Sequence, residues 1–143
     1  MMIPFEQFFF DEVRKENVFL RGLGYEERSE ASEWGIEVEY TNDAISVRYT
    51  FGDKDLLFNT CIKLGENREY GLWEWADALG TRAAKKITDN LVPDENALGQ
   101  LIQSSALCLK LNLKQILEAD SKTIKKIETA REAVRLEWES KYK

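Results

Sequence analysis

The chain contains no histidine, two cysteines, two prolines and eight glycines among its 143 residues. Histidine is the commonest general base and the commonest metal ligand, so its absence excludes a Ser-His or Cys-His nucleophile. The glycines form no phosphate-binding loop, and two distant cysteines do not make a structural zinc site. We therefore expect no catalytic residue, no bound metal and no cofactor.

Long apolar runs are also missing, and no stretch approaches the roughly 18–20 residues of a membrane helix. The N-terminus carries Glu6, Asp11 and Glu12, where a secretory signal needs a basic start and an unbroken apolar segment. Cys61 and Cys108 are flanked by apolar residues, which is more typical of buried thiols than of a disulfide. These absences predict a cytoplasmic protein.

The residues that are present are typical of a soluble globular domain. Hydrophobic residues make up 43% of the chain and charged residues 32%, which is enough at this length for a sizeable core. The low proline and glycine content indicates no linker or low-complexity segment. We expect residues 1–143 to form a single α+β domain.

Charge is distributed unevenly along the chain. Residues 1–43 hold 11 acids and 4 bases, whereas the other 100 residues hold 15 acids and 16 bases. Within residues 26–43, Arg28 is the only base among seven acids: Glu26, Glu27, Glu30, Glu33, Glu37, Glu39 and Asp43. Clustered charge attracts partners of opposite sign, although acidic surface also keeps a protein soluble, so both roles stay open.

The first part of the chain predicts a helix followed by an antiparallel sheet. Residues 4 to about 20 place four apolar side chains on one helical stripe: Phe5, Phe8, Phe9 and Val13. Apolar and polar residues then alternate over 34–41, 45–51 and 56–64, with short polar turns between, which predicts a meander with one buried face. A further strand within 66–71 is left open.

The outer face of that predicted sheet has its own set of side chains: Glu37, Glu39, Arg48, Asn59 and Lys63. Glu37 or Glu39 is expected to pair with Arg48 across the first hairpin, because cross-strand neighbours share a face. The sheet is therefore expected to bury one face and to carry charge on the other.

The rest of the chain predicts three or four helices on the apolar face of the sheet. Residues 72–79 form a short helix that ends at Gly80, and 82–90 form a second, weaker one. A long helix opens at 93–95, where proline and acids suit a first turn. Alternating leucines over 107–113 also fit a strand, but the helical register over 98–117 is longer and favours a helix buried on several sides.

A final helix is expected to begin with Ser121 as its cap. Its apolar stripe consists of Ile124, Ile127, Val134 and Trp138. The chain thus has an N-terminal helix, a three- or four-stranded meander and C-terminal helices, which is an α+β layer arrangement.

Some residues allow either a functional or a purely structural interpretation. Glu37 with Glu39, and Asp53 with Asp55, could perform acid–base chemistry or hold magnesium, but a solvated strand face and a hairpin turn are the favoured interpretations. Trp75 fits a core position with Trp73 at its edge, where Trp73 either packs or anchors a partner. Nucleic-acid binding is disfavoured, because the basic clusters are small on a chain of pI about 4.9.

The layout resembles small acidic α+β immunity proteins that bacteria encode beside polymorphic or contact-dependent toxins. The resemblance rests on the phenylalanine-rich first helix, Gly24-Tyr25, Ile36-Glu37-Val38-Glu39-Tyr40, Asn42-Asp43, the strand 45–49, the turn 52–55, the helix 70–79 and the leucine-rich helix that ends at 116–120. It implies a function by binding, in which the protein neutralises a cognate toxin. Many such toxins are cationic nucleases, which an acidic face would suit.

We therefore expect a non-enzymatic protein-binding domain, an immunity protein whose partner is a basic protein such as a nuclease-type toxin. The expected contact residues are Glu26, Glu27, Glu30, Glu33, Glu37, Glu39 and Asp43. Nucleic acid and membrane are not expected as partners, and the chain is either a monomer or a homodimer. The alternatives are a self-associating structural or regulatory protein, through Trp73 or the leucine-rich helix, and a carboxylate enzyme that uses a divalent metal.

Overall fold

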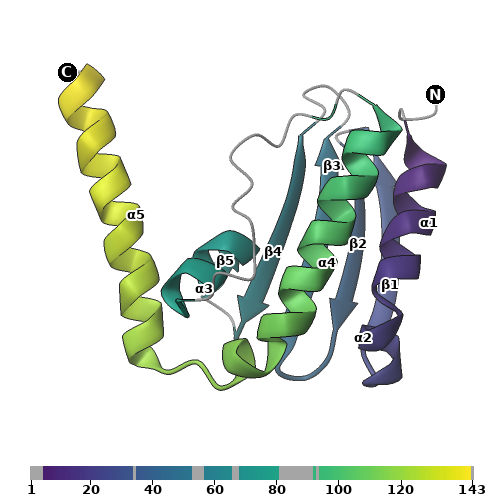
Figure 1. The fold of residues 1–143 in the computed structure, drawn as a ribbon, viewed down its shortest axis with the longest axis horizontal. Coiled ribbons are helices and arrows are strands. Elements are labelled where there is room, and N and C mark those ends of the chain that lie inside the picture. Colours follow the sequence, from purple (N-terminus) through teal and green to yellow (C-terminus); the bar gives the residue numbers. More distant parts are fainter. Residues whose placement is uncertain are drawn as a thin grey trace.

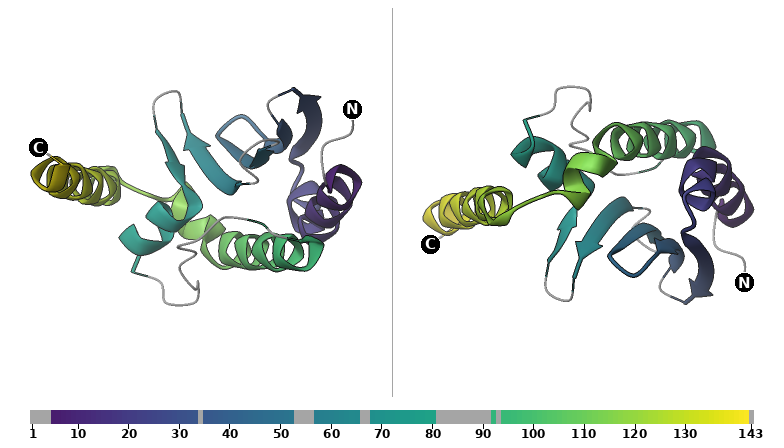
Figure 2. Two further views of the ribbon diagram at one scale, coloured as in Figure 1. Left: turned by 90° about the horizontal axis from the view of Figure 1, so that it is seen from above. Right: turned by 90° about the horizontal axis from the view of Figure 1, so that it is seen from below.

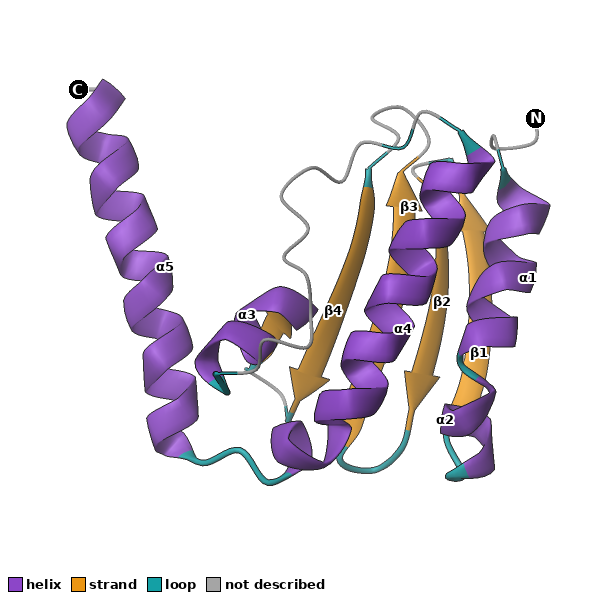
Figure 3. Cartoon of the chain, in the orientation of Figure 1, coloured by secondary structure: helices purple, strands orange, loops and turns teal. Residues whose placement is uncertain are grey.

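The computed structural model describes residues 5–33, 35–52, 57–65, 68–80, 92 and 94–142 (Figure 1). Its elements are α1 (Glu6–Glu16), α2 (Val18–Gly22), β1 (Glu26–Ser32), β2 (Gly35–Thr41), β3 (Ile45–Gly52), β4 (Phe58–Leu64), β5 (Glu69–Gly71), α3 (Leu72–Ala78), α4 (Glu95–Leu117) and α5 (Ser121–Tyr142). The strands follow one another in the chain between an N-terminal and a C-terminal set of helices (Figure 3). This confirms the α+β class.

The five strands form one sheet in the order β1-β2-β3-β4-β5, and every neighbouring pair is antiparallel. Burial alternates residue by residue along β2 and β3, as period-two patterning requires. The helices α1 and α4 lie against the buried face (Figure 2). The predicted meander is confirmed, and β5 supplies the strand that was left open within 66–71.

Strand β1 is a fifth strand that periodicity did not predict. Its sequence, EERSEAS, has no apolar alternation because every one of its residues except Glu27 is exposed. It is an edge strand, and the register pairs it along its whole length with β2. An edge strand is held by backbone hydrogen bonds to its neighbour and does not need buried apolar side chains. Much of the acidic segment 26–43 is therefore a strand, although its sequence shows no period.

The first helix is shorter than predicted and is broken at Asn17. The Asn17 side chain is completely buried; it donates to the carbonyl of Val13 at 2.8 Å and accepts from the hydroxyl of Tyr49 at 2.8 Å. This amide ends α1 and turns the chain into α2. Pro4 lies outside the described residues.

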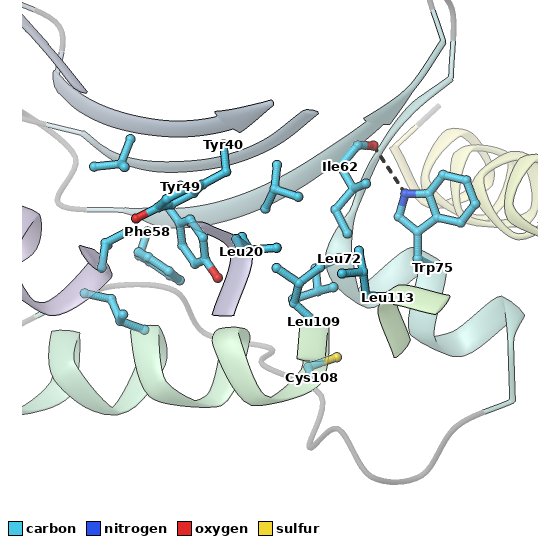
Figure 4. Close-up of a cluster of buried hydrophobic side chains, with 14 of the residues drawn as sticks. Leu20, Tyr40, Tyr49, Phe58, Ile62, Leu72, Trp75, Cys108, Leu109 and Leu113 are labelled. Carbon is cyan, nitrogen blue, oxygen red and sulfur yellow. Dashed lines mark hydrogen bonds between the residues drawn. The ribbon is translucent and has the colours of Figure 1, made fainter. Parts of the chain in front are cut away.

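One hydrophobic cluster joins the sheet to α1, α3 and α4. Figure 4 shows Tyr49, Leu109 and Leu113 in this cluster, with Trp75 at one end. Trp75 is fully buried and its indole N–H donates to the carbonyl of Ile62, while Trp73 is only partly buried, as predicted. Both cysteines are free thiols, as expected, but only Cys108 is buried, whereas Cys61 is half-buried.

The long helix α4 confirms the helical interpretation of 98–117, but not its burial on several sides. Leu107 and Leu111 are 55% and 53% exposed, because α4 covers the sheet with one face only. Asp94 caps its first turn by accepting from the N–H of Ala97. None of the helices in the described ranges is long and apolar enough to cross a membrane.

The last helix differs from the prediction in two ways. Asp120, not Ser121, is the cap, because its carboxylate accepts from the N–H and the hydroxyl of Thr123. The apolar stripe is buried only at Ile124 and Ile127, whereas Val134 and Trp138 are exposed. α5 contacts α3 at its beginning and then extends beside the molecule (Figure 1). The predicted helix 82–90 lies outside the described residues.

Candidate functional site

The candidate site is the sheet face opposite α1 and α4, which we call the outer face. No described helix lies over it (Figure 2). Cross-strand register assigns it these residues: Glu26, Arg28, Glu30 and Ser32 of β1, Gly35, Glu37, Glu39 and Thr41 of β2, Ser46, Arg48, Thr50 and Gly52 of β3, Asn59, Cys61 and Lys63 of β4, and Glu69 and Gly71 of β5. The face therefore combines five carboxylates with three cations.

Arg48 stands at the centre of this face and is shared by three carboxylates. Its guanidinium approaches Glu69 at 2.8 Å, Glu37 at 3.3 Å and Glu39 at 3.9 Å. The predicted pairing of Arg48 with Glu37 or Glu39 is confirmed, and Arg48 reaches both carboxylates. Because one cation serves three carboxylates, the centre of the outer face keeps an excess of negative charge.

Glu37 is the carboxylate that this excess affects most. Burial raises its pKa, and the neighbouring carboxylates Glu39, Glu30 and Glu69 raise it further, while Arg48 offsets only part of the effect. Glu30 is its direct cross-strand partner on β1. Like charges placed directly opposite each other destabilise a strand pair, so this position is electrostatically strained.

Two adjoining hollows flank the Glu30–Glu37 pair. One, of about 370 Å³, is lined by both carboxylates together with Gly35, Thr50 and Gly52, among others. The second lies between the same two carboxylates and Arg28, Glu39 and Arg48. Position 35 in the lining of the first hollow has no room for a side chain, because a Cβ there would lie 2.6 Å from the carbonyl oxygen of Phe51.

The seven acids expected from the sequence are not all on one surface. Glu26, Glu30, Glu37 and Glu39 share the outer face. Glu27 points to the other side, where it accepts from the hydroxyl of Tyr40 at 2.7 Å and lies 3.8 Å from Arg14.

The remaining two acids lie in turns at opposite ends of β2. Glu33 is exposed just before β2, and Asp43 is exposed just after it. A strand of this length separates its ends by roughly 20 Å, so the two turn residues do not act at one point. The structure thus brings four of the seven expected acids together.

Sequence reasoning missed Glu69, which makes the shortest contact to Arg48 on this face. The signal was available, because a strand within 66–71 would place Glu69 beside Lys63 on the outer face. Asp53 and Asp55 lie outside the described residues. Among the described residues, no three carboxylates or thiols are arranged to hold a metal ion.

Comparison with family models, with curated proteins and with solved structures finds no match to this chain. The arrangement of the outer face itself therefore carries the functional argument. Uncovered carboxylates in a hollow, with too few cations, are suited to receive positively charged groups.

Proposed function

We propose that this chain is a non-enzymatic protein-binding domain of the immunity type, whose outer face receives a basic protein. The observation that carries the proposal is the like-charged pair Glu30 and Glu37, placed opposite each other beside an Arg48 already shared by three carboxylates. A lysine or arginine from a partner would supply the missing cation.

The position of this pair makes such a contact effective. Glu37 is only partly exposed, and the hollows beside it leave room for a side chain to enter. Charge pairs that become desolvated at an interface contribute strongly to affinity, and the surrounding acids accelerate association at low salt. A cationic toxin, such as a nuclease in the cytoplasm, is the partner class that fits this chemistry.

The outer face is also separate from the residues that hold the fold together. The side chains that alternate with Glu37 and Glu39 on β2 are Ile36, Val38 and Tyr40, and these are buried. Substitutions on the outer face are therefore expected to leave the fold intact, so that they test binding alone.

The proposal is tested with the purified chain as bait in a lysate of the organism that encodes it, at low and at high salt. The informative variant is Glu30→Gln with Glu37→Gln, which removes two charges from the outer face. The control is Glu118→Gln with Glu137→Gln, which changes the net charge equally at exposed positions on other elements. Bound proteins are identified by mass spectrometry and their dissociation constants are then measured directly.

The expected result is one basic protein that binds the wild type and the control at low salt, with affinity falling by about tenfold or more in the outer-face variant. Inhibition of that protein's own activity by the wild type would establish the immunity role. Equal binding by all three baits, or a partner that is not basic, would contradict the assignment of this face.

A further inference from the structure

Strand β1 is the longer of the two sheet edges. The opposite edge, β5, has three residues and continues directly into α3, whereas β1 has seven residues and pairs with β2 on one side only. The helix α1 packs on β2 and α4 and reaches side chains of β1 through Arg14, which contacts Glu27 and Ser29. Among the described elements, none lies beyond the β1 edge (Figure 2). An open edge of this kind is a template for another strand.

The hydrogen bonds of the neighbouring hairpin show which backbone groups of β1 face outward. The N–H of Asn42 donates to the carbonyl of Ile45 at 3.1 Å, so these two residues form a bonded pair. Hydrogen-bonded and non-bonded residue pairs alternate in an antiparallel ladder. The backbone N–H and C=O groups of residues 36, 38 and 40 of β2 therefore point to β3, and those of residues 35, 37, 39 and 41 point to β1. In β1, residues 26, 28, 30 and 32 therefore bond to β2, and Glu27, Ser29 and Ala31 direct their N–H and C=O groups away from the sheet.

The side chains of β1 are complementary to a second, antiparallel copy of the same strand. When Ser29 faces the partner's Ser29, all seven residues overlap and Arg28 lies opposite the partner's Glu30. Symmetry repeats the contact, so that Glu30 lies opposite the partner's Arg28. The outward groups of Glu27, Ser29 and Ala31 then meet those of the partner's Ala31, Ser29 and Glu27 as bonded pairs.

Neighbouring registers do not have this complementarity. A shift of two residues in one direction places Arg28 opposite the partner's Arg28, and a shift in the other places Glu30 opposite the partner's Glu30. Like charges directly opposite each other are destabilising, so charge selects the register with the longest overlap. This self-complementarity identifies a second copy of the chain, rather than an unrelated strand, as the occupant of the edge.

We propose that two copies of this protein associate through β1 and form one continuous antiparallel sheet. Both sets of helices then lie on one side, and the two outer faces join on the other. The partner's Arg28 also adds a cation opposite Glu30, on the side of β1 away from Glu37. The proposal does not rest on the binding of a basic protein, and Glu37, Glu39 and Glu69 stay available on the joined face.

The test is sedimentation equilibrium of the full chain from micromolar to millimolar concentration. The key variant is Ser29→Pro, which removes an outward N–H and leaves the bonds to β2 and every charge unchanged. Its control is Ser29→Ala, which removes the hydroxyl that accepts from Arg14 and keeps the N–H. We expect the wild type and Ser29→Ala to dimerise, and Ser29→Pro to weaken the dimer by about a hundredfold, because a symmetric dimer loses two N–H donors.

A charge exchange provides the second measurement. Arg28→Glu alone and Glu30→Arg alone place like charges across the edge and are expected to abolish the dimer at these concentrations, whereas the double variant restores opposite charges and the dimer. A monomeric wild type, equal dimers of Ser29→Pro and Ser29→Ala, or a double variant no better than the single ones would each overturn the proposal. Because Ser29→Pro keeps the carboxylates of the outer face, its binding to a basic protein separates failure of this proposal from failure of the proposed function.

Discussion

The two faces of the sheet are made by the same strands but are chemically opposite. On β2, the buried side chains Ile36, Val38 and Tyr40 alternate with the outer-face carboxylates Glu37 and Glu39. The inner face is covered by α1 and α4, and no described helix covers the outer face. The difference teaches that the fold and the proposed binding surface depend on separate residues within each strand, so each can be altered without the other.

The largest expected effect on stability comes from a substitution at Phe51 of β3, which faces the core, while its neighbour Thr50 lies on the outer face. Phe51 is fully buried, stacks on Phe5 with ring centroids 6.2 Å apart and contacts Phe9. Phe51→Ala is expected to lower the free energy of unfolding by about 3–5 kcal/mol, because it leaves a cavity in the core. Denaturant unfolding monitored by circular dichroism measures the change.

The matched control for this prediction is Thr50→Ala, on the outer face next to Phe51. Its cost is expected to stay within about 0.5 kcal/mol, as is usual for surface substitutions. Comparable losses for Thr50→Ala and Phe51→Ala would show that the outer face also holds the fold together, and would remove the distinction between the two faces.

A smaller effect is expected from one hydroxyl of the inner face. The Tyr49 hydroxyl donates to the buried amide oxygen of Asn17, so Tyr49→Phe leaves that oxygen unpaired away from water. We expect a loss of about 1–2 kcal/mol in the free energy of unfolding. Tyr40→Phe is the control: its hydroxyl donates to the partly exposed Glu27, which water can reach, so the loss should be smaller. An equal cost for both substitutions would contradict the role given to Asn17.

The smallest expected change in stability is at Glu37, where substitution should stabilise the fold and not destabilise it. The raised pKa means that its ionised form is less favourable in the folded chain than in the unfolded chain. Its charge therefore reduces stability above the folded pKa, and the cost disappears as the pH falls through that value. Glu37→Gln is expected to raise the free energy of unfolding by about 0.2–0.5 kcal/mol at neutral pH and to change little below the pKa.

Glu74 provides the comparison for this pH dependence. Burial alone would raise its pKa, but hydrogen bonds from Arg131 and from the N–H of Gly71 outweigh burial and lower it. Glu74 therefore adds stability above its unfolded pKa and loses it as the pH falls through the folded pKa. Glu74→Gln should destabilise at neutral pH, with a difference that shrinks on acidification. A stability change of the same sign for Glu37→Gln and Glu74→Gln would refute the electrostatic account of the outer face.

Much of the fold could be predicted from local patterns. Alternation in β2, β3 and β4 assigned each residue to its face, and helical periodicity decided correctly between helix and strand for α4. The expectation that Glu37 or Glu39 pairs with Arg48 followed from the same alternation, and the structure shows both contacts. These predictions were possible because burial of one face imposes a period on the sequence.

Other features depend on residues that are distant in the sequence. Asn17 breaks the first helix because its side chain is held by Tyr49, 32 positions later. Strand β1 has no period because it is an exposed edge, and Glu69 joins Arg48 only through the pairing of β5 with β4. Local sequence does not contain these partners, so it could not predict the break at Asn17 or the edge strand, and it indicated Glu69 only through the strand left open within 66–71.

The sequence by itself determined the α+β class, the strands that bury one face and the side chains that alternate between the two faces. Periodicity and turn residues are sufficient for this, because each acts over a few neighbouring positions. Only the tertiary structure decided that the acidic segment forms an edge strand and that Glu27 turns inward to Tyr40 while Glu30 faces Glu37 on the outside. Those outcomes follow from strand register, which is set by contacts between segments and not within them.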